Sequence, residues 1–373
     1  MSGKHHKHPP LAKPSFGEYG RHEIGILGTK CSVIQELSEK LSEVLGLNRS
    51  SYIDAEHGEG EASSAFYSEL SDKVNFHRFD VRDQFDIYAR RPLLNNSDLI
   101  FVNGNHFHAF QQLILIDSSK YESVKRKLDR LTNVVGFVLL DDQTEVHDFL
   151  LDSDLGYQDL PVLQITDIAA IADLLKQKVM VTPRLNGLIL AGGKSRRMGQ
   201  DKGSIELHGI NQRQHMIDLL TPFVDKAFVS CRQDQEADLK PLYNTIPDRL
   251  TDMGPFGAIV SAFMTDPDAA WLVLAIDLPN FGQKALEKLV KNRVPAAVAT
   301  SYISPDSGFP EPLASIWEPK SYLHLLQFLN QGYSCPRKVL INSGDTHLIH
   351  ADSDAFLHNM NTPEDLENYR ANL

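Results

Sequence analysis

The sequence predicts an α/β protein with two domains, each built around a parallel β-sheet. At 373 residues the chain exceeds the size of one ordinary domain. In both halves, short apolar runs alternate with segments that carry apolar residues at helical spacing, which is typical of a parallel α/β layer. The first apolar run of each half ends in glycine close to a cationic residue, a turn that favours binding of an anion such as phosphate.

The bulk composition excludes several classes of protein. With 42% hydrophobic and 23% charged residues, the chain is typical of a soluble globular protein, and no apolar run approaches the roughly 18 to 20 residues that span a membrane. The N-terminus has no apolar signal-peptide core. The three isolated cysteines, Cys31, Cys231 and Cys335, argue against a disulfide framework and against a Cys-type zinc site. The net charge of -12 argues against nucleic-acid binding. We therefore expect a cytoplasmic protein with no membrane or nucleic-acid partner.

Residues 1–20 are rich in Lys, His and Pro and have almost no apolar periodicity, so we expect a disordered tail. His5, His6 and His8 could hold a metal ion, but a solvated tail is the favoured interpretation. Residues 21–178 form the first predicted domain. Its expected strands lie at 23–27, 51–54, 98–102, 134–140 and 161–165, and its expected helices at 33–45 and 168–175.

The turn after the first strand departs from a working phosphate loop. A P-loop places a glycine directly before lysine and then serine or threonine, so that backbone amides and the ammonium group meet the phosphates. Here Lys30 stands in place of that glycine, and Cys31 stands where the lysine is expected. We therefore predict a degenerate P-loop-like layer that does not bind nucleotide.

The second predicted domain, 185–373, follows a short polar segment that ends in Pro183 and Arg184. Its expected strands lie at 185–191, 227–230, 245–247, 270–276, 296–300 and 312–317, and its expected helices at 214–220, 257–264, 283–291, 323–329 and 363–369.

The first strand of this domain leads into the most informative stretch, LAGGKSRRMGQDK. Gly192 and Gly193 allow tight backbone conformations and have no side chain to hold a ligand away. The cationic residues that follow, which include Lys194 and Lys202, would neutralise a phosphate held by backbone amides. A basic surface loop is the alternative, but the concentration of glycines, cations and Asp-Lys in one loop favours a phosphate site.

Two aspartates follow other strands of the same domain. Asp248 comes after 245–247, and Asp277 comes after the most apolar run. Ligands of open parallel sheets bind outside the carboxyl ends of the strands, so both side chains belong to the expected site. Mg²⁺ is typically held by one or two carboxylates plus phosphates and water, which makes Asp277 the first choice as metal ligand. A helix N-cap is the alternative role for Asp277.

LAGGKSRRMGQDK resembles the signature of the molybdenum cofactor guanylyltransferase family, L-A-G-G-x-S-x-R-M-G-x-D-K, at every fixed position. GPFGAI at 254–259 is similar to that family's Gly-Pro-Leu-x-Gly turn, and HNMNTPEDL at 358–366 to its Asn-x-Asn-Thr-Pro-Glu segment. The family usually carries Cys-Asp-x-Pro around the metal ligand, and Ile276 replaces that cysteine here. The resemblance covers about half the chain and implies a Rossmann-like nucleotidyltransferase fold.

The resemblance also implies a reaction: Mg²⁺-dependent transfer of GMP from GTP to the phosphate of molybdopterin or molybdenum cofactor, with release of pyrophosphate. It implies a molybdoenzyme or a cofactor-delivery protein as partner. Lys202, Arg197 and Lys194 would be catalytic, Asp277 would hold Mg²⁺, and Asn359 and Asn361 would complete the active site. The implied nucleotide-binding residues are Leu190, Ala191, Gly192, Gly193, Lys194, Arg196, Arg197, Lys202, Asp248 and Asp277. Cytidylyl relatives tend to carry Ala at the position of Gly192.

The first domain is similar to the GTP-binding adaptor family that partners the guanylyltransferase, which makes it a degenerate, non-hydrolysing fusion partner. It departs from that family at the phosphate loop and at Asn103, where the family usually carries an acidic residue. A scaffold or dimerisation domain of another origin is the alternative. For the whole chain, the alternatives are a nucleotidyltransferase of the same fold that uses CTP or another phosphorylated acceptor, and a non-catalytic nucleotide- or cofactor-binding adaptor.

Overall fold

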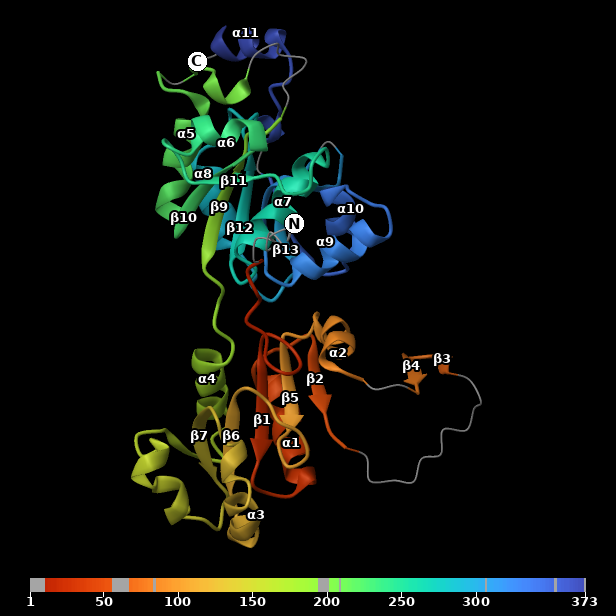
Figure 1. Ribbon diagram of the computed structural model, residues 1–373, viewed down its shortest axis with the longest axis vertical. Helices are drawn as coiled ribbons and strands as arrows, with labels where there is room; N and C mark the ends of the chain where they lie inside the picture. Colours follow the sequence, from red (N-terminus) through yellow and green to blue (C-terminus); the bar gives the residue numbers. More distant parts are fainter. Residues whose placement is uncertain are drawn as a thin grey trace, which may run out of the picture. The chain divides into compact units, whose positions relative to one another are not determined.

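A computed structural model describes residues 11–55, 67–82, 85–193, 201–207, 209–305, 307–351 and 354–371. The chain divides into two compact units, one formed by Phe16–Val181 and the other by Met1–Ser15 together with Thr182–Leu373. We call them the N-terminal and C-terminal units and describe each by itself (Figure 1). None of the helices in the described ranges is long and apolar enough to cross a lipid bilayer.

The N-terminal unit contains a six-stranded sheet in the order β2-β5-β1-β6-β7-β8, and every strand pairing in it is parallel. A separate antiparallel hairpin is formed by β3 and β4. The strands are β1 (Glu23–Leu27), β2 (Ser50–Ile53), β3 (Ser68–Lys73), β4 (Phe76–Val81), β5 (Leu99–Asn103), β6 (Gln112–Ile116), β7 (Val134–Leu139) and β8 (Val162–Gln164). The α-helices are α1 (Cys31–Val44), α2 (Ile87–Leu94), α3 (Tyr121–Lys125) and α4 (Ile168–Lys178).

Both faces of this sheet are covered. Successive strand residues point to opposite faces, and β6 shows the consequence. Leu113 and Leu115 pack in one core with residues of α1 and α4, whereas Ile114 and Ile116 pack in a second core with Val124 of α3. A strand that is buried on both faces has a nearly continuous apolar sequence, which explains the composition of the four fully buried strands, β1, β5, β6 and β7.

The segment just before β1 differs from the expected tail. Tyr19 is only 5% exposed. The buried carboxylate of Glu23 accepts hydrogen bonds from the backbone N–H groups of Glu18, Tyr19 and Gly20 (2.9, 2.7 and 3.1 Å). A buried charge is costly unless it is hydrogen-bonded, so Glu23 holds this segment against the sheet. The predicted tail is therefore wrong for residues 16–20, while residues 1–10 lie outside the described residues.

The C-terminal unit contains a seven-stranded sheet in the order β11-β10-β9-β12-β14-β13-β15. Its strands are β9 (Leu185–Leu190), β10 (Lys226–Cys231), β11 (Thr245–Pro247), β12 (Ala270–Ala275), β13 (Ala299–Ile303), β14 (Pro310–Trp317) and β15 (Thr346–His350). The predicted parallel-sheet α/β architecture is confirmed, with one strand, β14, that runs antiparallel to both β12 and β13. The sheet is therefore mixed, although the four strands β11, β10, β9 and β12 are parallel to one another.

Helices cover both faces of this sheet as well (Figure 1). On one face, Leu272 and Leu274 of β12 pack with residues of α5 and α8. On the other face, Trp271 and Val273 of the same strand pack with residues of α7, α9 and α10. The α-helices of the unit are α5 (Gln212–Leu220), α6 (Glu236–Leu239), α7 (Gly254–Thr265), α8 (Gln283–Lys291), α9 (Ser321–Asn330), α10 (Pro336–Asn342) and α11 (Pro363–Ala371).

Candidate active site

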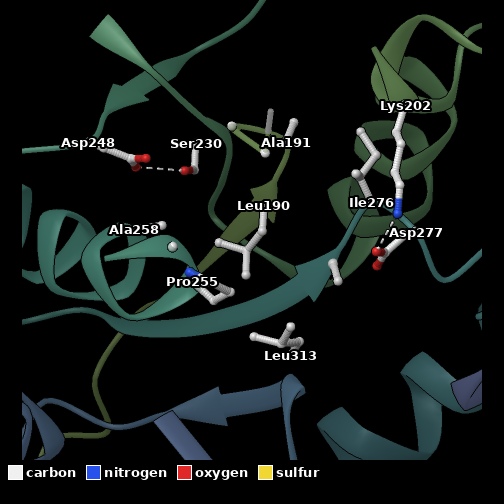
Figure 2. Close-up of a pocket in the computed structure, with 14 residues that line it drawn as sticks. Leu190, Ala191, Lys202, Ser230, Asp248, Pro255, Ala258, Ile276, Asp277 and Leu313 are labelled. Atoms are coloured by element: carbon white, nitrogen blue, oxygen red, sulfur yellow. Dashed lines mark hydrogen bonds and ion pairs between the residues drawn. The ribbon is translucent and has the colours of Figure 1, made fainter. Parts of the chain in front are cut away.

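The carboxyl ends of β9, β10, β11 and β12 meet at one edge of the sheet. Leu190 of β9 is in register with Ser230 of β10 and with Ala275 of β12, and Ser230 is in register with Ile246 of β11. A cavity lies at this edge (Figure 2). It is lined by Leu190, Ala191, Gly192, Gly193, Lys202, Ser230, Asp248, Gly254, Pro255, Ala258, Ala275, Ile276, Asp277 and Leu313.

Lys202 links two oxygen-bearing side chains at one end of this cavity. Its ammonium group donates to Oδ2 of Asp277 and to Oδ1 of Asn361, both at 2.9 Å. The Lys202 and Asp277 side chains are 14% and 22% exposed, so the ion pair is largely shielded from water. Such a pair is weakly screened, and a ligand phosphate reaching it meets a fixed positive charge.

Residues close to Lys202 in the sequence hold its loop in place. Lys202 begins a short 3₁₀ turn, in which the carboxylate of Asp201 accepts from the N–H of Gly203 (3.0 Å). Asp201 also forms an ion pair with the largely buried Arg213 of α5. Gly203 lies against that guanidinium, and a Cβ at this position would come within 2.4 Å of Arg213 Cζ. A side chain at position 203 would therefore push the Arg213 guanidinium out of its present place.

A small apolar cluster joins this loop to the C-terminal segment. Ile205 and Leu207, just after the 3₁₀ turn, pack against Met360 and Leu366. The backbone N–H of Met360 donates to the carbonyl oxygen of Asp277 (2.8 Å), which fixes the segment at the end of β12. These contacts explain how Asn361 reaches Lys202 across 159 positions of sequence.

The backbone of Asn361 is held by the start of α11. Asp365 accepts from the N–H groups of Asn361 and Thr362 (both 2.8 Å), and Thr362 Oγ1 accepts in turn from the N–H of Asp365 (3.2 Å). This reciprocal pair is a capping box. The hydrogen bond from Asn361 and those from Thr362 lower the pKa of Asp365, so the box favours the ionised carboxylate.

A second polar pair lies on the other side of Leu190 in Figure 2. Ser230 Oγ donates to Oδ1 of Asp248 (3.1 Å). Burial raises the pKa of Asp248, while the bond from Ser230 and the charge of Arg232 act in the opposite direction. Arg232 forms a two-point ion pair with Asp234 and also donates to the carbonyl oxygen of Gly192 (3.3 Å).

The two glycines at the end of β9 have different surroundings. Among the described residues, a Cβ on Gly192 would lie 3.4 Å from the backbone nitrogen of Arg232 and from Asp248 Oδ2, which is ordinary contact, and a Cβ on Gly193 would meet no atom within 4 Å. Alanine would therefore fit at either position against the described part of the chain.

The structure brings most of the sequence-predicted site residues together. Leu190, Ala191, Gly192, Gly193, Lys202, Asp248 and Asp277 all line the cavity, and Asn361 contacts Lys202. Asn359 instead lines a neighbouring cavity that shares Pro255 and Leu313 with the first and also contains Glu311 and Arg337. Lys194, Arg196 and Arg197 lie outside the described residues.

Several residues at this edge were not predicted from the sequence. Ser230 and Arg232 stand at the carboxyl end of β10, so the same edge rule that selected Asp248 could have found them. Leu313 had no such signal. It comes from β14, which runs antiparallel to its neighbours, and its position at this edge depends on that direction.

The donor set at Lys202 fits Mg²⁺. The carboxylate of Asp277 and the amide oxygen of Asn361 both point at one cationic group, and hard oxygen atoms are the ligands that Mg²⁺ prefers. Mg²⁺ is usually held by one or two carboxylates, and substrate phosphates and water supply the remaining ligands, so a single protein carboxylate is sufficient.

Comparison with known proteins first gives the class of protein to which the C-terminal unit belongs. The sequence pattern of the MobA-like NTP transferase domain matches residues 187–347, which lie within the C-terminal unit. This unit is therefore a nucleotidyltransferase domain. A solved structure of molybdopterin-guanine dinucleotide biosynthesis protein A from Archaeoglobus fulgidus aligns with a TM-score of 0.42 and 24% identity, covering 50% of this chain and 97% of that one.

Similarity to known protein sequences then identifies the family within this class. The molybdenum cofactor guanylyltransferase of Pseudomonas aeruginosa is 33% identical over 192 residues, which cover 50% of this chain and 96% of that protein. This chain belongs to the molybdenum cofactor guanylyltransferase family, as the signature predicted. The molybdenum cofactor biosynthesis bifunctional protein of Synechocystis is 38% identical over 192 residues, covering 51% of this chain. The chain spans only 54% of the length of that relative.

Proposed function

We propose that the C-terminal unit transfers GMP from GTP to the phosphate of molybdopterin or its molybdenum form and releases pyrophosphate. The observation that carries the proposal is the shielded Lys202–Asp277–Asn361 group in a cavity at the carboxyl ends of four parallel strands. Family membership supports the nucleotide and the acceptor, because the relatives carry the name guanylyltransferase.

Both reactants are anions, so charge and orientation dominate the barrier. Lys202 is held by two partners and needs little reorganisation to place its ammonium group against the α-phosphate. No general base is required, because a phosphate monoester is already largely ionised near neutral pH. The chain therefore has to position and neutralise the two phosphates rather than activate the acceptor.

The residues at the end of β9 suit the nucleotide. The backbone of 190–193 would approach the guanine and the phosphates closely, since neither glycine carries a side chain. Asp248, held by Ser230, would accept hydrogen bonds from the nucleoside. We assign Lys194, Arg196 and Arg197 to the β- and γ-phosphates, where their charge would neutralise the leaving pyrophosphate.

The acceptor would enter through the neighbouring cavity. That cavity shares Pro255 and Leu313 with the nucleotide cavity, and Asn359 and Arg337 line it. Arg337 is held by Glu311 (3.1 Å) and is 39% exposed, so it stays available to an anionic group. An acceptor phosphate bound there would face the nucleotide across the shared wall.

Asp277, with Asn361 beside it, would hold Mg²⁺. When bound, the ion supplies positive charge to the phosphates, as in other phosphoryl-group transfers. We place the reaction in the cytoplasm, with a molybdoenzyme or a cofactor-delivery protein receiving the product.

The test is pyrophosphate release by the full chain with Mg²⁺ and molybdopterin or its molybdenum form, comparing GTP, CTP, ATP and UTP. Release with GTP alone is expected. Release with CTP would keep the mechanism and change the base, in conflict with the assignment of Gly192. Absence of release with all four nucleotides would overturn the proposed acceptor.

A further inference from the structure

Three side chains with metal-binding atoms meet in the N-terminal unit, which does not contain the transferase residues. Cys31 is the first residue of α1, Asp54 follows β2, and His106 follows β5. Their ligand atoms all lie within 4.8 Å of one another. His106 and Asp54 are 25% and 24% exposed, so the group is half-buried but reachable from solvent.

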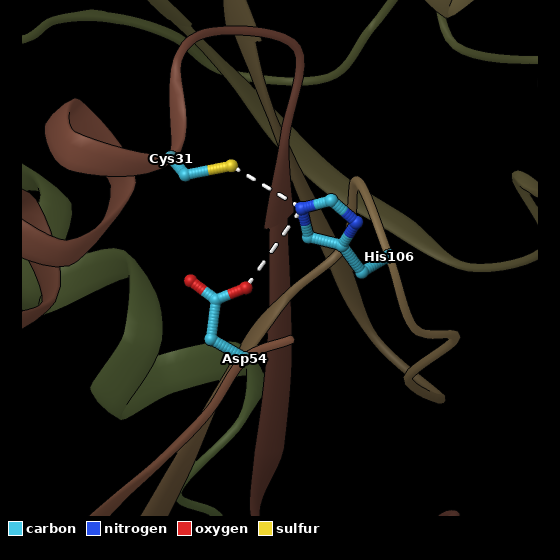
Figure 3. Close-up of side chains that lie close together, drawn as sticks. All are labelled: Cys31, Asp54 and His106. Atoms are coloured by element: carbon cyan, nitrogen blue, oxygen red, sulfur yellow. Dashed lines mark hydrogen bonds and ion pairs between the residues drawn. The ribbon is translucent and has the colours of Figure 1, made fainter. Parts of the chain in front are cut away.

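The geometry around His106 separates two interpretations of this group (Figure 3). In a Cys-His-Asp nucleophilic triad, the thiol and the carboxylate face opposite nitrogens of the imidazole. Here Cys31 Sγ lies 3.3 Å from Nε2 and Asp54 Oδ1 lies 3.9 Å from the same Nε2. Both partners face the same nitrogen, so the group lacks the relay geometry of a triad, and its three ligand atoms lie close enough together to share one ion.

We propose that Cys31, Asp54 and His106 form a binding site for a divalent transition-metal ion of the zinc type. Ligand atoms bound to one tetrahedral zinc ion lie about 3.3 to 3.7 Å apart, given the known bond lengths. The Cys31–His106 and His106–Asp54 separations of 3.3 and 3.9 Å are close to that range, and all three ligand atoms lie within 4.8 Å of one another, so an ion would have to draw them closer together. A thiolate, an imidazole and a carboxylate together favour Zn²⁺ or Co²⁺ over Mg²⁺ or Ca²⁺, which prefer oxygen ligands alone.

A further layer of hydrogen bonds orients the carboxylate. Asn103, which is fully buried, donates its side-chain amide to both oxygens of Asp54 (2.9 Å each), and the Tyr52 hydroxyl donates to Oδ2 (2.9 Å). The N–H of Ala55 donates to Oδ1 (2.7 Å). Metal-binding carboxylates are commonly held in this way, because a fixed orientation raises affinity. Asn103 thus has a role here that an acidic residue could not perform, since it donates to Asp54.

The hydrogen-bond donors of the adjacent turn are used within the protein. The N–H of Gly28 donates to Oδ1 of Asn105 (3.3 Å), and the Asn105 amide donates to the carbonyl oxygen of Thr29 (2.8 Å). The Thr29 hydroxyl donates to the carboxylate of Asp117 (2.7 Å). These donors serve the turn itself, and a second carboxylate beside it disfavours an anion. The Lys127 ammonium beside the turn donates to the carbonyl oxygen of Asn105 (2.9 Å).

Binding would proceed by simple ligation. Cys31 would lose its thiol proton to solvent and bind as thiolate, while neutral His106 would bind through Nε2. With three protein ligands, a fourth position would remain for water or for a group of a substrate, as in catalytic zinc sites. The proposal concerns the N-terminal unit and does not depend on the proposed transferase reaction.

The test is Co²⁺ titration of the full chain, followed by absorbance. The tail histidines are removed first as His5→Ala, His6→Ala and His8→Ala, because they could bind the same ion. We expect one cobalt ion per chain and the intense near-ultraviolet band of a thiolate–cobalt bond. Zn²⁺ should abolish that band by displacement. A tail-substituted chain that binds no cobalt, or binds it without the thiolate band, overturns the proposal.

Matched variants assign the ligands. Cys31→Ser should remove the thiolate band, and His106→Ala should weaken binding by at least about tenfold, the lower range for perturbing a metal site. Cys335→Ser and His108→Ala, at an exposed cysteine and an exposed histidine, should leave both readouts unchanged. Persistence of the band in Cys31→Ser, or its loss in Cys335→Ser, contradicts the assignment. Asp54→Asn gives an independent reading, by loss of affinity, if a variant fails to fold by circular dichroism.

Discussion

Both units begin their sheet with an apolar strand that ends in glycine, but the atoms around the two turns differ. After β9, Gly192 and Gly193 border a cavity that also contains the Lys202 ammonium group. After β1, Gly28 takes a φ of +104°, and its N–H donates to the side chain of Asn105. A Cβ on Gly28 would lie 2.2 Å from the carbonyl oxygen of Leu115, so this glycine is required by the protein itself.

The difference shows that a strand–glycine–helix turn does not by itself make a phosphate site. Whether such a turn can bind phosphate depends on the residues that the rest of the fold places beside it. In the C-terminal unit these include a lysine with two fixed partners, and in the N-terminal unit they include Asp54, Asp117 and a thiol. If both proposals are correct, the C-terminal edge binds the anionic groups of a nucleotide and the N-terminal edge binds a cation.

The sharpest test of this contrast is Lys202→Ala. Losing one charge partner of a transition state lowers turnover by roughly 10² or more, so we expect a fall of that size in pyrophosphate release. Lys291→Ala, an exposed lysine of α8, is the matched control and should keep the normal rate. Near-normal turnover in Lys202→Ala with an unchanged melting temperature would contradict the proposal that Lys202 neutralises phosphates bound after β9.

Asn361→Ala tests whether Lys202 needs its second partner. A hydrogen bond to a charged group contributes about 1.5 kcal/mol or more, so we expect turnover to fall by roughly tenfold. KM for GTP should change less, because the bond orients the ammonium group and does not contact the base. The exposed Asn292→Ala serves as control. A loss as large as that of Lys202→Ala would instead indicate that Asn361 contacts the reacting groups directly.

Gly192→Ala tests whether the glycine after β9 is needed by the nucleotide and not by the protein, unlike Gly28 after β1. The added methyl group fits the protein, so stability should change by less than about 0.5 kcal/mol. If the nucleotide approaches this backbone closely, KM for GTP should rise by roughly fivefold, equivalent to about 1 kcal/mol. Gly282→Ala, with no neighbour within 4 Å of its Cβ, is the control. An unchanged KM would show that nucleotide and Gly192 are not in contact.

Replacing a carboxylate at each of the two edges should change the free energy of unfolding in opposite directions at neutral pH. Burial raises the pKa of Asp248, so the folded chain carries the cost of a buried charge at neutral pH. That cost disappears as the pH falls through the raised pKa. Asp248→Asn should therefore increase the free energy of unfolding at pH 7, and the gain should shrink toward pH 4.

Asp117 is the matched residue of the other edge. Burial works to raise its pKa, but hydrogen bonds from Ser119 and Thr29 outweigh it and lower the pKa. Its ionised form stabilises the fold above the unfolded pKa, and this contribution is lost as the pH falls through the lowered value. Asp117→Asn should thus reduce stability at pH 7. Denaturant unfolding of both variants between pH 4 and pH 8 measures these changes in the free energy of unfolding. If both variants were stabilised, or both destabilised, at pH 7, the predicted difference between the two edges would be wrong.

The smallest effect is expected from Lys30→Ala. Lys30 is exposed at the start of α1 and takes the place of a phosphate-loop glycine. Because the N-terminal turn uses its own donors internally, pyrophosphate release should stay at the normal rate. A clear loss of GTP turnover would mean that the N-terminal unit contributes a nucleotide site after all.

Most of the elements in both sheets could be predicted from the sequence. The strands at β1, β9, β11 and β12 are continuous apolar runs or short β-prone segments, and their helices carry regular apolar spacing. β6 was not predicted, although it is fully buried and pairs with β1 and β7. A run of five residues that begins with the polar Gln112 gives a weak local signal, even though Asp117 and Ser118 mark a turn after it.

The edge rule is enough to place Lys202, Asp248 and Asp277 in one region from the sequence alone. That inference works because the carboxyl ends of parallel strands meet at the same edge whatever the order of the strands. It could not find Leu313, whose position depends on an antiparallel strand, nor could it separate Asn359 from Asn361. Neighbouring residues outside regular structure have no fixed direction until they pack.

The sequence by itself determined the fold class, the family and the strand ends that carry the chemistry, because periodicity and motif spacing are local properties of the chain. Only the tertiary structure decided which distant residues meet. Lys202 and Asn361 are 159 positions apart, and Cys31 and His106 are 75 apart. Such pairs depend on strand order and on the apolar contacts that fix each loop, and these follow from the packing of the whole unit.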